Sequence, residues 1–140
     1  MAKSNKPHEN ARWRFLSKVV PALFACESVF LFYMALQPRY AVPSIGMPFL
    51  RGGDLEHFLA YLAYGILACG TFSLKIRDRK KAALATLAWC ALYGGIIEGM
   101  QAFVPSRLAD PLDWVADVLG SGAGVLVAKR FLLLEKRKES

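Results

Sequence analysis

Four long apolar segments, separated by polar or glycine- and proline-rich stretches, dominate the chain. They run roughly over Val19–Leu36, Leu55–Leu74, Ala82–Val104 and Leu112–Leu134. A helix needs about 20 mainly apolar residues to cross the hydrocarbon core of a bilayer, and the four segments are close to or above that length. The pattern predicts an all-α protein, a four-helix transmembrane bundle.

Two short stretches have the composition of helix starts. In Gly52-Gly53-Asp54 and Ala109-Asp110-Pro111 the aspartate can cap free backbone N–H groups, and Pro111 suits a first helical turn. The stretch between the first two apolar segments is broken by three prolines and three glycines, so we expect a loop there and no further helix.

The distribution of basic residues predicts the orientation in the membrane. Fifteen of the eighteen lysines and arginines precede the first apolar segment, follow the last, or lie between the second and third. Cytoplasmic loops carry an excess of Lys and Arg, so we expect both termini in the cytoplasm. The loops Gln37–Gly53 and Pro105–Asp110 then face outward. The net charge of +7 accompanies membrane segments and no nucleic-acid-binding motif, so we expect no nucleic-acid partner.

We divide the chain into a basic cytoplasmic segment (residues 1–18), a transmembrane domain (19–134) and a charged cytoplasmic tail (135–140). The first apolar run is longer than that of a cleaved signal peptide, which favours a retained anchor. Cys26, Cys69 and Cys90 all lie inside apolar segments, and their odd number argues against a disulfide framework.

Polar residues gather at the predicted outer ends of the last three segments. Ionisable residues within a membrane are costly and normally face a bundle interior or a wet cavity, so they indicate a site. Asp54, His57 and Tyr61 share one helical face, as do Glu98 and Gln101, and Asp110, Asp113 and Asp117 form one stripe. We expect these residues, with Arg107, to bind a ligand; the candidates for catalysis are His57, Glu98, Asp113 and Asp117.

Some of these residues have structural explanations. Asp54 and Asp110 are also explained as helix caps, and Asp113 as a first-turn charge favoured by the helix dipole. Arg107 could serve only to neutralise Glu98 or Asp113. His57, Glu98 and Asp117 have no comparable structural role. Glu27, in the middle of the first segment, fits a packing role or a site role equally well.

A pair of glycines in the fourth segment predicts close helix packing. Gly120 and Gly124 form a G-x-x-x-G motif, which lets two membrane helices approach closely. The third segment offers Ala88, Ala91 and Gly95 as small partners. We therefore expect the third and fourth helices to pack tightly, with the acidic stripe held against Glu98.

The polar motifs together resemble the VanZ-like family of bacterial integral membrane proteins. The resemblance covers about residues 28–124 and rests on Tyr93-Gly94, Ile97-Glu98, Gln101, Phe103, Pro105, Arg107, Asp110, Asp113 and Gly120. Asp54, His57-Phe58, Tyr61 and Ala35-Leu36-Gln37-Pro38 add to it. Asp117 stands where the family commonly has Asn, and Ala35 replaces the usual Ser. The resemblance implies the bacterial inner membrane, and the family is named for a protein that raises resistance to teicoplanin.

Three functions remain open. The first is an envelope protein that binds a lipid headgroup, a cell-wall precursor or an amphiphilic antibiotic, with Arg107 holding a phosphate or carboxylate. The second is a membrane enzyme acting on a lipid-linked substrate, with His57 or Glu98 as general base. The third is a small proton-coupled transporter in which Glu27 extends the polar path. We expect no cofactor, although Asp113 and Asp117 could hold a divalent cation, and a homodimer is a further expectation.

Overall fold

The chain forms four α-helices in the computed structural model, which describes residues 7–37, 52–105, 107 and 110–138. The helices are α1 (Pro7–Ala35), α2 (Gly52–Lys75), α3 (Arg79–Gln101) and α4 (Pro111–Lys138). Each contains a stretch long and apolar enough to cross a membrane. The predicted all-α fold with four such helices is confirmed. The loop predicted between the first two apolar segments falls mainly on residues 38–51, outside the described residues.

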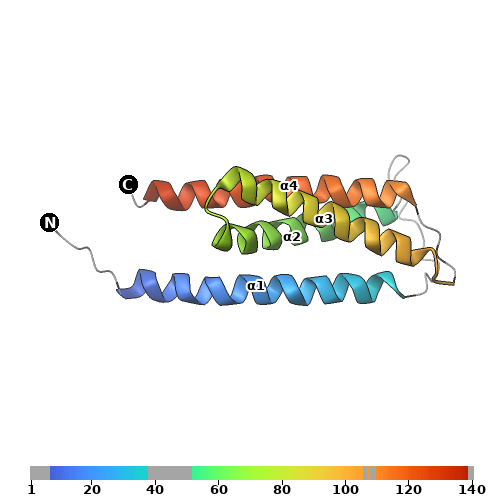
Figure 1. Ribbon diagram of the computed structural model, residues 1–140, viewed down its shortest axis with the longest axis horizontal. Helices are drawn as coiled ribbons and strands as arrows, with labels where there is room; N and C mark the ends of the chain where they lie inside the picture. Colours follow the sequence, from blue (N-terminus) through green and yellow to red (C-terminus); the bar gives the residue numbers. More distant parts are fainter. Residues whose placement is uncertain (1–6, 38–51, 106, 108–109, 139–140) are drawn as a thin grey trace.

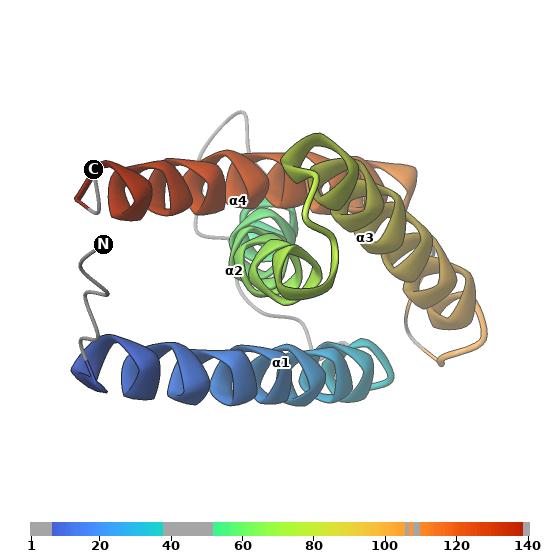
Figure 2. The same ribbon diagram turned by 60° about the vertical axis from the view of Figure 1, so that its left-hand side comes forward.

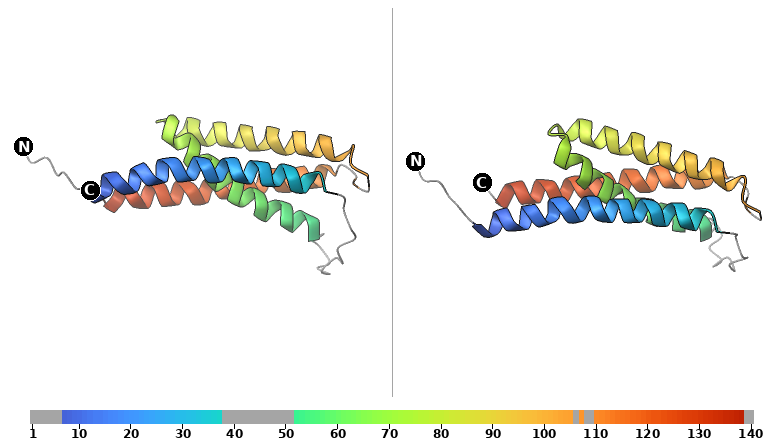
Figure 3. Two further views of the ribbon diagram at one scale, coloured as in Figure 1. Left: turned by 90° about the horizontal axis from the view of Figure 1, so that it is seen from below. Right: turned by 60° about the horizontal axis from the view of Figure 1, so that its bottom comes forward.

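Helix α2 is the central element of the bundle. It packs against α1, α3 and α4, and Figure 2 shows it between α1 and α4. The start of α1, the α2–α3 connection and the end of α4 point toward the same end of the bundle (Figures 1 and 3). The described residues of the three basic clusters predicted to be cytoplasmic therefore share one end, while the orientation of that end in the cell stays a prediction.

The glycines of α4 pack against α2, so the predicted partner helix was wrong. A Cβ atom added to Gly120 would lie 2.3 Å from the Phe58 carbonyl oxygen, and one added to Gly124 would lie 2.3 Å from the Leu62 carbonyl oxygen. From the other side, a Cβ on Gly65 would lie 2.6 Å from the Ser121 carbonyl oxygen. The two backbones thus meet at a distance that only glycine allows.

Helix α3 contacts α4 through an aromatic side chain. The Trp114 indole N–H donates to the Ala91 carbonyl oxygen at 2.9 Å. A Cβ on Gly95 would lie 3.5 Å from Trp114 Nε1, an ordinary contact. Of the small residues predicted on the third helix, Ala91 and Gly95 do face α4, but they contact the Trp114 indole ring and not the glycine motif.

Two helix boundaries differ from the predicted segments. Helix α3 begins at Arg79 because the Asp78 carboxylate caps it, accepting hydrogen bonds from the backbone N–H groups of Lys80 and Lys81. It ends at Gln101 rather than near Val104, since Pro105 disfavours helical geometry in the residue before it. Helix α1 begins at Pro7, well before the apolar run, and proline is favoured at a first helical position.

Helix α1 is attached to the bundle by a buried aromatic and polar cluster. The Tyr64 side chain is fully buried; its ring stacks on Phe24, and its hydroxyl bonds the Ser28 hydroxyl at 3.0 Å. The Trp89 indole donates to the same Tyr64 oxygen, and the Tyr93 hydroxyl donates to the Ser28 carbonyl. These bonds satisfy polar groups within the predicted membrane region, where water cannot.

Candidate functional site

The predicted site residues that the structure describes lie at one end of the bundle. This is the end where α1 and α3 finish and where α2 and α4 begin. It is opposite the end that carries the basic clusters. Helix direction alone brings the residues of three helices to one level, because α2 and α4 run antiparallel to α3.

A histidine between two aspartates forms the centre of the site. His57 Nδ1 lies 2.9 Å from Asp117 Oδ1, and His57 Nε2 lies 3.8 Å from Asp113 Oδ2. The Asp117 side chain is fully buried, Asp113 is nearly so, and the His57 side chain is 19% exposed. The acidic stripe of α4 thus faces α2, which is the helix that supplies His57.

A second polar group joins the end of α3 to the loop that follows it. Glu98 Oε2 accepts the Asp110 backbone N–H at 3.3 Å. In the amide orientation that satisfies both neighbours, Gln101 donates to Glu98 Oε1 at 3.0 Å and accepts from Arg107 Nη1 at 2.7 Å. Glu98 and Gln101 are both buried, so the amide connects Arg107 to a carboxylate inside the protein.

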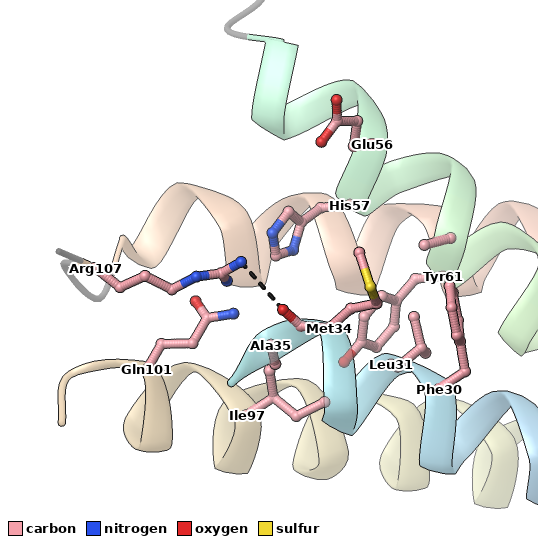
Figure 4. Close-up of a pocket in the computed structure, with 11 residues that line it drawn as sticks. Phe30, Leu31, Met34, Ala35, Glu56, His57, Tyr61, Ile97, Gln101 and Arg107 are labelled. Atoms are coloured by element: carbon pink, nitrogen blue, oxygen red, sulfur yellow. Dashed lines mark hydrogen bonds between the residues drawn. The ribbon is translucent and has the colours of Figure 1, made fainter. Parts of the chain in front are cut away.

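Arg107 also binds the carboxyl end of α1. Its Nε donates to the Gln37 carbonyl oxygen at 2.9 Å, and its Nη2 donates to the Met34 carbonyl oxygen at 3.2 Å. The last carbonyl groups of a helix have no partner within the helix, so these bonds cap α1. The guanidinium is consequently fixed where three helices meet, as Figure 4 shows.

A pocket of about 200 Å³ lies beside these groups, between α1, α2 and α3. Its polar wall consists of Glu56, His57, Gln101 and Arg107. Its apolar wall comes largely from α1 and consists of Phe30, Leu31, Met34 and Ala35, with Ala60 and Ile97 from α2 and α3. The cavity therefore changes from charged to apolar along its length, which suits an amphiphile.

A glycine makes room for the deepest polar groups. A Cβ atom added to Gly94 would lie 2.8 Å from Asp117 Oδ2 and 3.4 Å from the Tyr61 hydroxyl oxygen. Both side chains are buried, and the Tyr61 hydroxyl is hydrogen-bonded to the Asp117 carboxylate. The deepest part of the site is thus a buried tyrosine–aspartate pair next to His57.

The sequence model of the VanZ/LLP1 family matches residues 5–134. The chain belongs to the VanZ/LLP1 family. No curated protein and no solved structure matched the chain in the same comparisons. Membership confirms the family suggested by the polar motifs, and with four membrane-spanning helices it identifies a multi-pass membrane protein.

The structure separates the predicted site residues of this VanZ/LLP1 protein by role. His57, Tyr61, Gln101 and Arg107 line the pocket, while Glu98, Asp113 and Asp117 support them from behind. Asp110 is a helix cap, as one interpretation predicted, because its carboxylate accepts the Leu112 N–H at 3.0 Å. Asp54 lies in the first turn of α2 and does not line the pocket.

Sequence reasoning missed one complete wall of the pocket. Phe30, Leu31 and Met34 carry no chemical signal that distinguishes them from other lipid-facing residues of α1. Glu56 was also missed, although a carboxylate directly before His57 in an otherwise apolar helix was a usable signal. Among the described residues, no group of three His, Cys, Asp or Glu is arranged to hold a metal ion.

Proposed function

We propose that this VanZ/LLP1 family protein binds the headgroup of an amphiphile at the outer leaflet of the bacterial inner membrane. The amphiphile is a membrane lipid, a lipid-linked cell-wall precursor or an amphiphilic antibiotic. The pocket carries the proposal because its polar end faces one end of the bundle and its apolar wall continues toward the middle. A headgroup and the first part of its chain can lie along that gradient.

Arg107 is the group that we assign to a phosphate or carboxylate of the headgroup. A guanidinium presents five N–H donors in a planar fork that matches both anions. The carbonyl groups of Met34 and Gln37 and the amide of Gln101 hold this fork in one orientation at the pocket wall. Preorganisation of this kind lowers the entropy lost on binding.

The proposal is tested by native mass spectrometry of the purified protein with a mixture of phosphatidylethanolamine, phosphatidylglycerol and cardiolipin. We expect discrete lipid adducts with the wild type and at least about tenfold weaker adducts with Arg107→Gln, because a charge-assisted bond is lost. Arg107→Lys keeps the charge but not the fork, so it should fall between them. Lys129→Gln, at the opposite end of the bundle, is the matched control. Equal adducts with Arg107→Gln and the control would contradict the proposal.

Competition experiments identify which amphiphile is the natural one. In these experiments a lipid-linked wall precursor or teicoplanin competes with the bound lipid. The competitor is the better ligand if it displaces that lipid at a lower concentration than other lipids do. Preference for teicoplanin predicts that expression in a susceptible bacterium raises the inhibitory concentration of that drug. An unchanged inhibitory concentration would argue against a contribution to glycopeptide resistance.

A second candidate function rests on the hydrogen bond between His57 and Asp117. A buried aspartate that orients a histidine beside a cavity is the arrangement of a general base. An enzyme would convert a lipid-linked substrate, and His57→Gln would abolish the product. Incubation with lipid-linked wall precursors, with and without EDTA, tests this candidate, and bound but unchanged precursor would contradict it.

A further inference from the structure

The pocket end of the protein carries more negative than positive charge. Among the residues that the structure describes, six acidic ones belong to it, against one arginine, Arg107; the acidic ones are Asp54, Glu56, Glu98, Asp110, Asp113 and Asp117. By formal charge, this end favours a headgroup that includes a positive group over one that carries only negative charge.

Charges of both signs line the pocket itself. Glu56 on α2 and Arg107 in the loop after α3 belong to different elements, and Figure 4 shows His57 between them. Arg107 is held by carbonyl and amide oxygens, whereas no other described residue forms a hydrogen bond or ion pair with the exposed Glu56. Glu56 is exposed and lines the pocket, so a cationic group of a ligand can reach it.

Tyr61 also presents a hydroxyl oxygen to the pocket. Its side chain is 3% exposed and lines the pocket, and its hydroxyl is hydrogen-bonded to the Asp117 carboxylate. A hydroxyl that donates to a carboxylate can still accept a hydrogen bond, so a ligand that offers N–H groups fits this region.

We propose that the pocket selects a zwitterionic lipid whose phosphate binds Arg107 and whose primary ammonium group binds Glu56. Lipids with a phosphoethanolamine headgroup have this chemistry. A primary ammonium group has three donors, whereas a quaternary ammonium group has none, so lipids with a choline headgroup fit less well. This inference rests on the proposed function, because it specifies the headgroup that the same pocket takes.

The apolar wall favours a lipid over the free headgroup. Phe30 and Leu31 continue the pocket away from Arg107, and with Met34 they give the first methylene groups of a chain an apolar surface. Soluble phosphoethanolamine would use only the polar end. We therefore expect it to bind much more weakly than the lipid that carries it.

The test measures the affinity of the purified full chain, in a neutral detergent, for dihexanoyl forms of phosphatidylethanolamine, phosphatidylglycerol and phosphatidylcholine, and for soluble phosphoethanolamine. We expect phosphatidylethanolamine to bind about tenfold tighter than each of the other three, since one charge-assisted hydrogen bond or the chain contacts distinguish them. Glu56→Gln should remove the preference over phosphatidylglycerol. Glu135→Gln, on the last turns of α4 at the opposite end, removes the same charge and should keep the preference.

The outcomes separate this inference from the proposed function. Equal or tighter binding of phosphatidylglycerol, or a preference that survives Glu56→Gln, would overturn the zwitterionic assignment while leaving an amphiphile site in place. Soluble phosphoethanolamine that binds as tightly as the lipid would overturn the lipid as its source. Absence of binding by folded protein to all three lipids would overturn the proposed function and this inference together.

Discussion

At the scale of single residues, the deepest part of the site depends on the absence of a side chain at Gly94. Its missing side chain leaves space for Asp117 and Tyr61, both of which are buried against α3. A Cβ atom at 2.8 Å from Asp117 Oδ2 would force that carboxylate to move, because real Cβ contacts are longer. Movement of Asp117 would in turn break its bond to His57.

We predict that Gly94→Ala disrupts the site while the fold remains. Lipid binding should weaken by about tenfold or more, because a small displacement of Asp117 removes its hydrogen bond to His57, which lines the pocket. Native mass spectrometry with the lipid mixture named above measures the loss. Gly99→Ala is the matched control in the same helix, since nothing lies within 4 Å of a Cβ there. Equal losses in both variants would show that alanine acts through the helix and not through Asp117.

The pair formed by His57 and Asp117 also makes a prediction about stability. Removal of one partner leaves the other polar group buried without compensation, which typically costs about 3–5 kcal/mol. His57→Phe should therefore lower the free energy of unfolding strongly. The double variant His57→Phe/Asp117→Leu should recover most of that loss. Unfolding in mixed micelles is measured for the wild type, both single variants and the double variant, and additive effects of the two substitutions would contradict the pairing.

Polar residues of the site could be predicted from the sequence, and apolar ones could not. Ionisable residues are costly in apolar helices, so each of His57, Glu98 and Asp117 indicates a polar environment inside the bundle, independently of the rest of the fold. Phe30 and Leu31 are ordinary in a membrane helix, and only the packing of α1 shows that they face a cavity. The role of Arg107 as a cap of α1 could not be predicted, because it depends on a contact between two parts of the chain that lie far apart in the sequence.

At the scale of helices, the glycines of α4 specify a close approach but not the partner. A G-x-x-x-G motif states how near another backbone can come and contains no information on which helix supplies it. The sequence therefore predicted tight packing correctly and assigned it to α3 wrongly. Helix α2 carries Gly65 at the level of Ser121. Glycines on both helices therefore allow the close α2–α4 contact.

We predict that Gly124→Ala destabilises the fold. The added methyl group would lie 2.3 Å from the Leu62 carbonyl oxygen, and overpacking of this kind costs about 1–3 kcal/mol or more. The apparent melting temperature in detergent should fall by several degrees. Gly122→Ala, two residues away on α4, meets nothing within 4 Å and should leave the melting temperature unchanged. A stable Gly124→Ala variant would mean that α2 and α4 are farther apart than described.

At the scale of the whole molecule, the two ends of the bundle differ in chemistry. Among the residues that the structure describes, the end with the start of α1, the α2–α3 connection and the end of α4 collects thirteen basic residues. The opposite end holds the pocket and six of the eleven acidic residues. The sequence predicted this division because the number and direction of the helices follow from the apolar segments. It could not predict that α1 would supply a pocket wall.

The orientation of these ends in the membrane is the prediction on which the proposed outer-leaflet site depends. Short loops rich in Lys and Arg remain in the cytoplasm, so the connection that contains Lys80 and Lys81 should be inside and the pocket outside. An alkaline phosphatase fused after Lys81 should therefore be inactive, whereas one fused after Arg107 should be active, because this reporter folds only outside the cytoplasm. Fluorescent protein fusions at the same two positions should give the reverse pattern and control for expression. The opposite result with both reporters would place the pocket at the inner leaflet, and its ligand would then be an amphiphile of that leaflet.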